Sequence, residues 1–269
     1  MPQQILVGPN AVWKQPIAQF GALQSQGVTI LDNWEEQLDA NNQPTISLQT
    51  YLDKAHTAGL KVIVQLNATQ PIPWKHPAIA ATSQDDEPDN IWVSGDTGIT
   101  ARLQTQYAMS KANRPDLPVY LNIDGWQWQW QKPPYTTFFA CCDFLIDDYY
   151  FDLRALDIAD WSARQSAIQT QAAGKLVATY VATSYQNEPA IYYPNQRTPT
   201  VASVQQQFDA AAALQLATPI FPQSFNPFAY TSQPADISAL IAEANAPPLE
   251  FWSGILTVKQ GKITNIKQD

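Results

Sequence analysis

Residues 47–67, SLQTYLDKAHTAGLKVIVQLN, contain one complete helix–strand unit, and the fold can be worked out from it. Residues 47–58 form an amphipathic, helix-like segment that stops at Gly59, and glycine is the residue type that most often follows the end of a helix. The apolar run KVIVQLN at residues 61–67 has the length and β-branched content of a buried strand. Repetition of such units favours an α/β fold with a parallel sheet covered by helices.

Strand-like runs of this kind recur along the 269-residue chain. They lie at residues 4–8, 28–32, 61–67, 78–84, 118–124, 143–149, 176–182 and 219–224. Helix-like segments lie at residues 16–24, 47–58, 97–112, 158–173, 201–216 and 236–246, whereas residues 85–96 have the pattern of a loop. Eight strands with intervening helices, in a chain near the usual length of about 250 residues, predict a (β/α)8 TIM barrel rather than an open doubly wound sheet.

The C-terminal segment has a different pattern. Residues 251–266 alternate between apolar and polar side chains on either side of Gln260-Gly261, and this pattern predicts a C-terminal β-hairpin. No linker, low-complexity tract or long charge run interrupts the chain, so residues 1–269 are expected to form a single domain.

The composition excludes several classes of function. Charged residues make up only 14% of the chain, and the net charge is −9 with a pI of about 4.6. A nucleic-acid partner is not expected, because phosphate binding needs a basic face. No apolar run approaches the roughly 20 residues of a membrane-spanning helix, and no N-terminal secretory pattern is present. Low charge and an acidic pI nevertheless favour an exported protein, extracellular or at the cell surface.

Cysteine and histidine are too scarce for a metal site of several soft or imidazole ligands. The cysteines are the adjacent Cys141 and Cys142, and the histidines are His56 and His76, both of which are expected to be structural. No glycine-rich phosphate loop is present, so neither a metal nor a cofactor is expected. Acid–base chemistry therefore falls to carboxylates.

Polar and aromatic residues follow the predicted strands, where the active sites of barrels lie. Amides and acids bind sugar hydroxyls, and aromatic rings stack on the apolar face of a sugar. Trp126 could instead pin its loop to the barrel rim as a buried indole. The residues predicted to orient or stack on a sugar are Asn33, Trp34, Asn67, Asp124, Trp126, Tyr149, Tyr180 and Gln223.

The densest acidic run is Asp85-Asp86-Glu87-Pro88-Asp89, directly after the predicted fourth strand. Crowded acids raise one another's pKa, so that a carboxylic acid can stay protonated near neutral pH and act as a general acid. The alternative is a solvated acidic loop.

Two motifs add a family resemblance. His76-Pro77-Ala78-Ile79 followed by Asp86-Glu87-Pro88-Asp89 resembles the HPA(L/I)…DEPD pattern of carbohydrate-active barrels related to clan A glycoside hydrolases. In those families the Glu before Pro is the acid/base, which implies that role for Glu87. The run 143–150, DFLIDDYY, is similar to a D-(I/V)-hydrophobic-V-D-x-Y-P strand of the same barrels. The resemblance covers about thirty residues.

The chain departs from that pattern at the predicted seventh strand, where the family places a nucleophilic Glu. Residues 176–182, LVATYVA, contain no acid, and Glu188 comes only six residues later. Two schemes could replace the missing acid. In the first, Asp147 or Asp148 faces Glu87, and the separation of the carboxyls decides between a nucleophile and a water-activating base.

Because neighbouring strand residues point to opposite faces, only one of these two aspartates can enter the site. Asp148 is preferred because it matches the Asp before Tyr in the family strand. In the second scheme, Asp85 and Glu87 act as the Asp-x-Glu unit of chitinase-type enzymes, assisted by Tyr149.

These observations predict a glycoside hydrolase that acts on an oligo- or polysaccharide. The alternative from another class is a barrel that binds glycan without cutting it, such as an adhesion or virion-surface module, and the missing seventh-strand acid favours it. A polysaccharide lyase is less favoured, because the predicted mouth offers few cations to assist proton abstraction.

Overall fold

The computed structural model describes most of the predicted strands and helices. The described residues are 11–13, 17–25, 30–34, 46–67, 70–124, 133–147, 157–172, 174–179, 200–214, 255–259 and 262–267. The predicted strands at 4–8 and 219–224 and the predicted helix at 236–246 lie outside them.

A seven-stranded parallel sheet forms the centre of the fold. Its strands follow one another in sequence order, and each pairs with the next in the same direction. They are β1 (Ala11–Trp13), β2 (Ile30–Trp34), β3 (Lys61–Gln65), β4 (Ile79–Ser83), β5 (Val119–Ile123), β6 (Phe144–Asp147) and β7 (Leu176–Thr179). Ile123 lies opposite Asp147, which lies opposite Thr179, so β5, β6 and β7 end at one edge.

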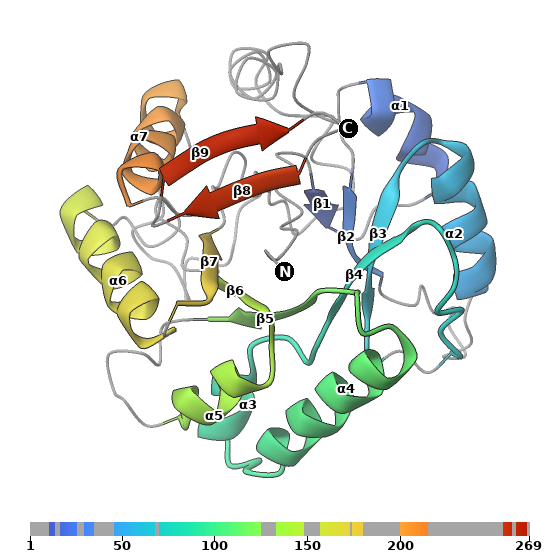
Figure 1. The fold of residues 1–269 in the computed structure, drawn as a ribbon, viewed down its shortest axis with the longest axis horizontal. Coiled ribbons are helices and arrows are strands. Elements are labelled where there is room, and N and C mark those ends of the chain that lie inside the picture. The colour runs from blue at the N-terminus through green and yellow to red at the C-terminus, as the bar shows by residue number, and fades with distance from the viewer. Residues whose placement is uncertain are drawn as a thin grey trace.

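Helices surround this sheet on its outer side (Figure 1). They are the 3-10 turn η1 (Ile17–Gln19) and helices α1 (Phe20–Ser25), α2 (Leu48–Thr57), α3 (Pro88–Val93), α4 (Ile99–Asn113), α5 (Tyr135–Ala140), α6 (Ile158–Gln171) and α7 (Val201–Ala213). The curled parallel sheet with an outer helical ring has the architecture of a (β/α)8 barrel, as predicted.

Local sequence explains where the helices begin and end. The Ser47 hydroxyl accepts a hydrogen bond from the Thr50 backbone N–H, and Asp157 caps α6 in the same way through Ala159. Gly59 follows α2 with a φ of 73°, a left-handed conformation that glycine adopts at no steric cost.

The hydrophobic core lies between the sheet and the helices. Leu121 and Ile123 of β5 pack there with α-helical residues such as Phe138 and Trp161, all fully buried. Because side chains alternate along a strand, Asn122 of β5 faces the barrel interior instead. The strand therefore places an apolar face against the helices and a polar face in the barrel.

One element contradicts the sequence prediction. Residues 85–96 were expected to be a loop, but they contain α3, which begins with Pro88 at its first position. Proline is favoured there because its fixed φ suits a helix and its missing N–H would have had no helical partner. The loop prediction was therefore wrong for residues 88–93.

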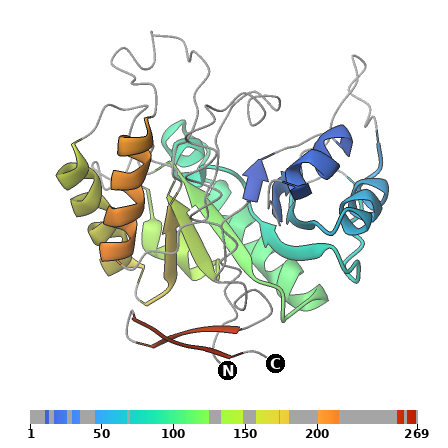
Figure 2. The ribbon, with the colours of Figure 1, turned by 90° about the horizontal axis from the view of Figure 1, so that it is seen from above.

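The predicted C-terminal hairpin is confirmed. Strands β8 (Ile255–Lys259) and β9 (Lys262–Lys267) pair antiparallel on either side of residues 260–261. The hairpin is a separate sheet that lies across one end of the barrel (Figure 2). Among the described residues, no helix is long and apolar enough to cross a membrane.

Candidate active site

Glu87 follows β4 with an unusual backbone conformation. Its φ of 45° and ψ of 57° lie in the left-handed region, and no other described non-glycine residue has a positive φ. For an ordinary residue this conformation costs roughly 1–2 kcal/mol. Strained backbone of this kind tends to persist at functional sites, where the surrounding structure holds it in place.

A single amide joins Glu87 to Asp124, the residue after β5. The Nδ2 atom of Asn90, on α3, donates to Glu87 Oε2 at 2.9 Å and to Asp124 Oδ2 at 2.8 Å. Both hydrogens of this amide are thus directed at carboxylates. Next to this pair, the Nδ2 atom of Asn122 donates to Asp86 Oδ1 at 2.8 Å. Amide side chains therefore hold the acids of two neighbouring strand ends together.

Asp89, on α3, contacts Asp124 and is fully buried. Its carboxylate accepts hydrogen bonds from the Asp124 backbone N–H at 3.2 Å and from the Tyr135 hydroxyl at 3.0 Å. Burial, and secondly the nearby Asp124 charge, raise the pKa of Asp89 to about 7. The acidic run thus contains one carboxyl whose pKa is raised by its surroundings, and that carboxyl supports the end of β5.

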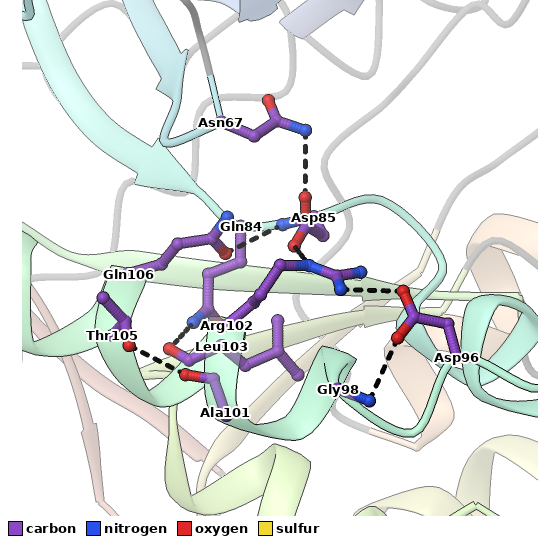
Figure 3. A network of polar contacts seen from close by, with 10 residues as sticks. All are labelled: Asn67, Gln84, Asp85, Asp96, Gly98, Ala101, Arg102, Leu103, Thr105 and Gln106. Carbon is purple, nitrogen blue, oxygen red and sulfur yellow. Dashed lines mark hydrogen bonds and ion pairs between the residues drawn. The ribbon is translucent and has the colours of Figure 1, made fainter.

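Asp85 is held by a separate network, shown in Figure 3. Its side chain accepts hydrogen bonds from Asn67 Nδ2 at 3.0 Å and from Arg102 Nε at 3.3 Å, and its backbone N–H donates to Gln106 Oε1. Arg102 also donates to Asp96 at 2.7 Å, so one guanidinium pairs with two carboxylates. Asp85 is therefore bound within the protein by a cation and an amide.

Asp147, at the end of β6, is directed toward helix α6. Its fully buried carboxylate accepts hydrogen bonds from Arg164 at 3.4 Å and from Gln165 Nε2 at 2.5 Å. Burial raises the pKa of Asp147, while the Arg164 charge opposes that rise. Of the two neighbouring aspartates, Asp147 is thus bound to the helical layer, whereas Asp148 lies outside the described residues.

The HPAI motif has a structural explanation. His76 Nδ1 accepts a hydrogen bond from the Ala78 backbone N–H, so the ring proton lies on Nε2 and is donated to Asp53 Oδ1 at 3.0 Å. Asp53 belongs to α2, and the contact fixes the start of β4 to that helix.

The structure describes only some of the predicted site residues. It brings Glu87 and Asp124 together, and Asp85 and Asn67 form the neighbouring network. The backbone of Asn33 and Trp34 forms the end of β2. Trp126, Asp148, Tyr149, Tyr180 and Gln223 lie outside the described residues.

Several residues of the site were missed by the sequence reasoning. Asn90 lies three residues after Glu87 on α3, and Asn122 lies two residues before Asp124 on one face of β5. Both spacings are readable once the helix and strand are assigned. Tyr135 and Arg102 reach the site from distant segments, and no local pattern indicates them.

The carboxylates of the site are hydrogen-bonded by other protein side chains. No group of three or more His, Cys, Asp or Glu side chains in the described part of the chain is arranged to hold a metal ion. Amides, a hydroxyl and a guanidinium instead satisfy the carboxylates.

Comparisons with known proteins concern the fold. No protein-family model and no curated protein sequence matches the chain. A β-galactosidase from Rahnella sp. R3 superposes with a TM-score of 0.60 at 9% identity, covering 91% of this chain and 57% of that chain. An endo-1,4-β-D-mannanase from Thermotoga petrophila RKU-1 superposes with a TM-score of 0.56 at 12% identity, covering 88% and 98%.

The GH53 catalytic domain from Ignisphaera aggregans gives a TM-score of 0.55 at 11% identity, covering 82% of this chain and 86% of that domain. The chain spans 57% and 59% of the length of two β-galactosidases that it resembles. At these identities the likeness is one of fold. This chain therefore folds as a (β/α)8 barrel of the kind found in these glycoside hydrolases.

Proposed function

We propose that this protein is a glycoside hydrolase that cleaves O-glycosidic bonds of an oligo- or polysaccharide, with Glu87 as the general acid. The observation that carries the proposal is the pair formed by Glu87 and Asp124, held by one amide at neighbouring strand ends of a barrel. The left-handed backbone at Glu87 supports it, because the fold maintains a strained conformation at that residue.

The chemistry follows from the position of this acid. Glycoside cleavage needs a proton on the departing oxygen as the bond to the anomeric carbon breaks. Glu87 is only partly buried, so its carboxyl can meet a substrate while Asn90 fixes its orientation. Asn67 is exposed and donates its amide N–H to Asp85, and its carbonyl oxygen, on the side away from Asp85, would accept a sugar hydroxyl (Figure 3). Sugar contacts by the other predicted site residues stay predictions.

The contacts of Asp85 weigh against the chitinase-type scheme. That scheme needs Asp85 to be available to a substrate acetamido group, but Asp85 is bound by Arg102 and Asn67. A substrate would have to displace a charged partner, which costs more than displacing water. Asp148 remains the partner expected from the sequence, and Asp148→Asn tests it.

The experiment is a reducing-end screen of wild type and Glu87→Gln over neutral, acetamido and uronate polysaccharides. Glutamine keeps the shape and loses the proton, so we expect cleavage to fall by about 10²–10⁴-fold. Cleavage of a dinitrophenyl glycoside of the released sugar should fall far less in Glu87→Gln, because dinitrophenolate leaves without needing a proton. Asp116→Asn, on the exposed surface, is the matched control. Undiminished polysaccharide cleavage by Glu87→Gln would refute the assignment.

A glycan-binding barrel without activity is the second candidate, and one observation favours it. Strand β7, Leu176–Thr179, carries no acid, although the resembling enzymes use one there. Calorimetric binding of a glycan by wild type, without new reducing ends after prolonged incubation, would establish this alternative and exclude hydrolysis.

A further inference from the structure

We propose that Asp124 is the second catalytic carboxylate and acts as the nucleophile of a retaining mechanism. This inference rests on the proposed function and assigns to Asp124 the role that the sequence assigned to Asp148. It also goes beyond the sugar-orienting role predicted for Asp124.

The first argument is the separation of the two carboxylates. Glu87 Oε2 and Asp124 Oδ2 bind the same nitrogen of Asn90, at 2.9 and 2.8 Å. Since the two N–H bonds of an amide diverge by about 120°, these oxygens lie about 5 Å apart. A retaining pair has carboxyls about 5–5.5 Å apart, whereas an inverting pair needs about 6.5–9.5 Å to admit a water. The separation is therefore that of a retaining pair and is shorter than that of an inverting pair.

The second argument is the support around Asp124. The residue is 7% exposed, its backbone N–H donates to Asp89, and its carboxylate accepts from Asn90. Tyr135 holds Asp89 in turn. A nucleophile must be fixed within a fraction of an ångström of its productive position, and two contacts from α3, one of them supported by α5, provide such fixation.

The third argument concerns charge. With the pKa of Asp89 raised to about 7, that carboxyl is largely neutral in mildly acidic solution. Asp124 then has one fewer negative neighbour, and its ionised form is the one that attacks carbon.

The proposed reaction has two steps. In the first, an Asp124 carboxylate oxygen bonds to the anomeric carbon, the glycosidic C–O bond breaks, and the departing oxygen takes the Glu87 proton. In the second, the Glu87 carboxylate removes a proton from water, the water oxygen bonds to the anomeric carbon, and the ester to Asp124 breaks. Both carboxyl groups return to their initial state, and no further reactant is needed.

The decisive experiment uses Asp124→Ala with a dinitrophenyl glycoside of the sugar released by wild type in the reducing-end screen. We expect turnover to fall by about 10⁴-fold, and added sodium azide to restore it by occupying the space of the carboxylate. The azide product should have the anomeric configuration opposite to that of the substrate. Proton NMR of the wild-type reaction should show a first-formed sugar of retained configuration.

Control variants separate this role from a structural one. Asp124→Asn preserves the shape and should also lose turnover while unfolding at a temperature close to that of wild type. Asp148→Ala, treated in parallel, should show no rescue by azide. Asn90→Leu removes the bridge and should shift the pH profile of turnover. Asn113→Leu is its control and should leave the profile unchanged, because the Asn113 amide donates only to an exposed backbone carbonyl of α4.

Three results would overturn the proposal. They are an inverted wild-type product, an Asp124→Asn variant with more than about a tenth of wild-type turnover, and azide rescue at Asp148→Ala in place of Asp124→Ala. Each can occur while Glu87 still acts as the acid, so failure here is distinct from failure of the proposed function. A wild type that releases no reducing ends would overturn both.

Discussion

Replacing Asp89 with asparagine is expected to stabilise the protein above about pH 7 and to change its stability little near pH 4. Burial raises the pKa of Asp89 from 3.8 to about 7 in the folded protein, so between these values the folded chain binds a proton that the unfolded chain has released. Wild-type stability therefore contains a contribution that falls as pH rises through this window and is constant above it. At 1.36 kcal/mol per pH unit, the full effect is at most about 4 kcal/mol.

The assay is urea unfolding of wild type and Asp89→Asn at several pH values between about 4 and 8. Asparagine can still accept from the Asp124 N–H, and its amide can donate to the Tyr135 oxygen, so the contacts of the site survive. The stability difference between the two proteins isolates Asp89 from other titrating groups. Asp116→Asn is the control, because Arg114 lowers the pKa of that exposed carboxyl and its pH trend has the opposite sign. A stability difference that is flat, or that shrinks with rising pH, would show that burial does not raise the pKa of Asp89 in the folded protein.

Three further predictions concern stability in urea. Glu87→Gly should be about 1 kcal/mol more stable than Glu87→Ala, because only glycine adopts the left-handed backbone without steric cost, and equal stability would mean that this backbone is unstrained. Arg164→Leu should lower the free energy of unfolding by about 3–5 kcal/mol, because it leaves Asp147 buried without its cation. Adding Asp147→Leu should recover part of that loss, and no recovery would contradict the pairing. Phe138→Ala should cost about 3–5 kcal/mol, against about 0.5 kcal/mol or less for the exposed Val93→Ala, and similar losses would contradict the placement of the core.

The fold was predictable where hydrophobic pattern and helix-ending signals agree. The run 61–67 contains β3, Lys61–Gln65, and Gly59 marks the end of the preceding helix, because strand burial and helix termination are local properties of the chain. Helix α3 was missed because acids and a proline close together also suggest a turn. The helix has only six residues, so Pro88 at its first position was the one sign of a helix start and no longer periodic pattern supported it.

The site was predictable only as a set of strand-end residues. Sequence reasoning identified Glu87 and Asp124 because residues that end neighbouring parallel strands meet at one edge of the sheet. It could not identify Asn90 as their bridge, since that contact depends on the helix that was missed. The Tyr135–Asp89 contact joins residues 46 positions apart and depends on packing of α5 against the barrel. Packing of this kind has no local sequence signal.

The missing acid on β7 has a different meaning once Glu87 and Asp124 are treated as a pair. The clan A pattern that the sequence resembles places a nucleophilic Glu at the end of the seventh strand, so a seventh strand without an acid suggests lost activity. A pair formed by Glu87, after β4, and Asp124, after β5, needs no acid on β7, because Asn90 binds both carboxylates and sets a separation close to that of a retaining pair. Position 87 is the critical one, because its left-handed backbone and the Asn90 bridge together set the direction of its carboxylate. The absence of an acid on β7 is therefore compatible with hydrolysis, and the stereochemistry of the wild-type product distinguishes this pairing from one that uses an inverting water.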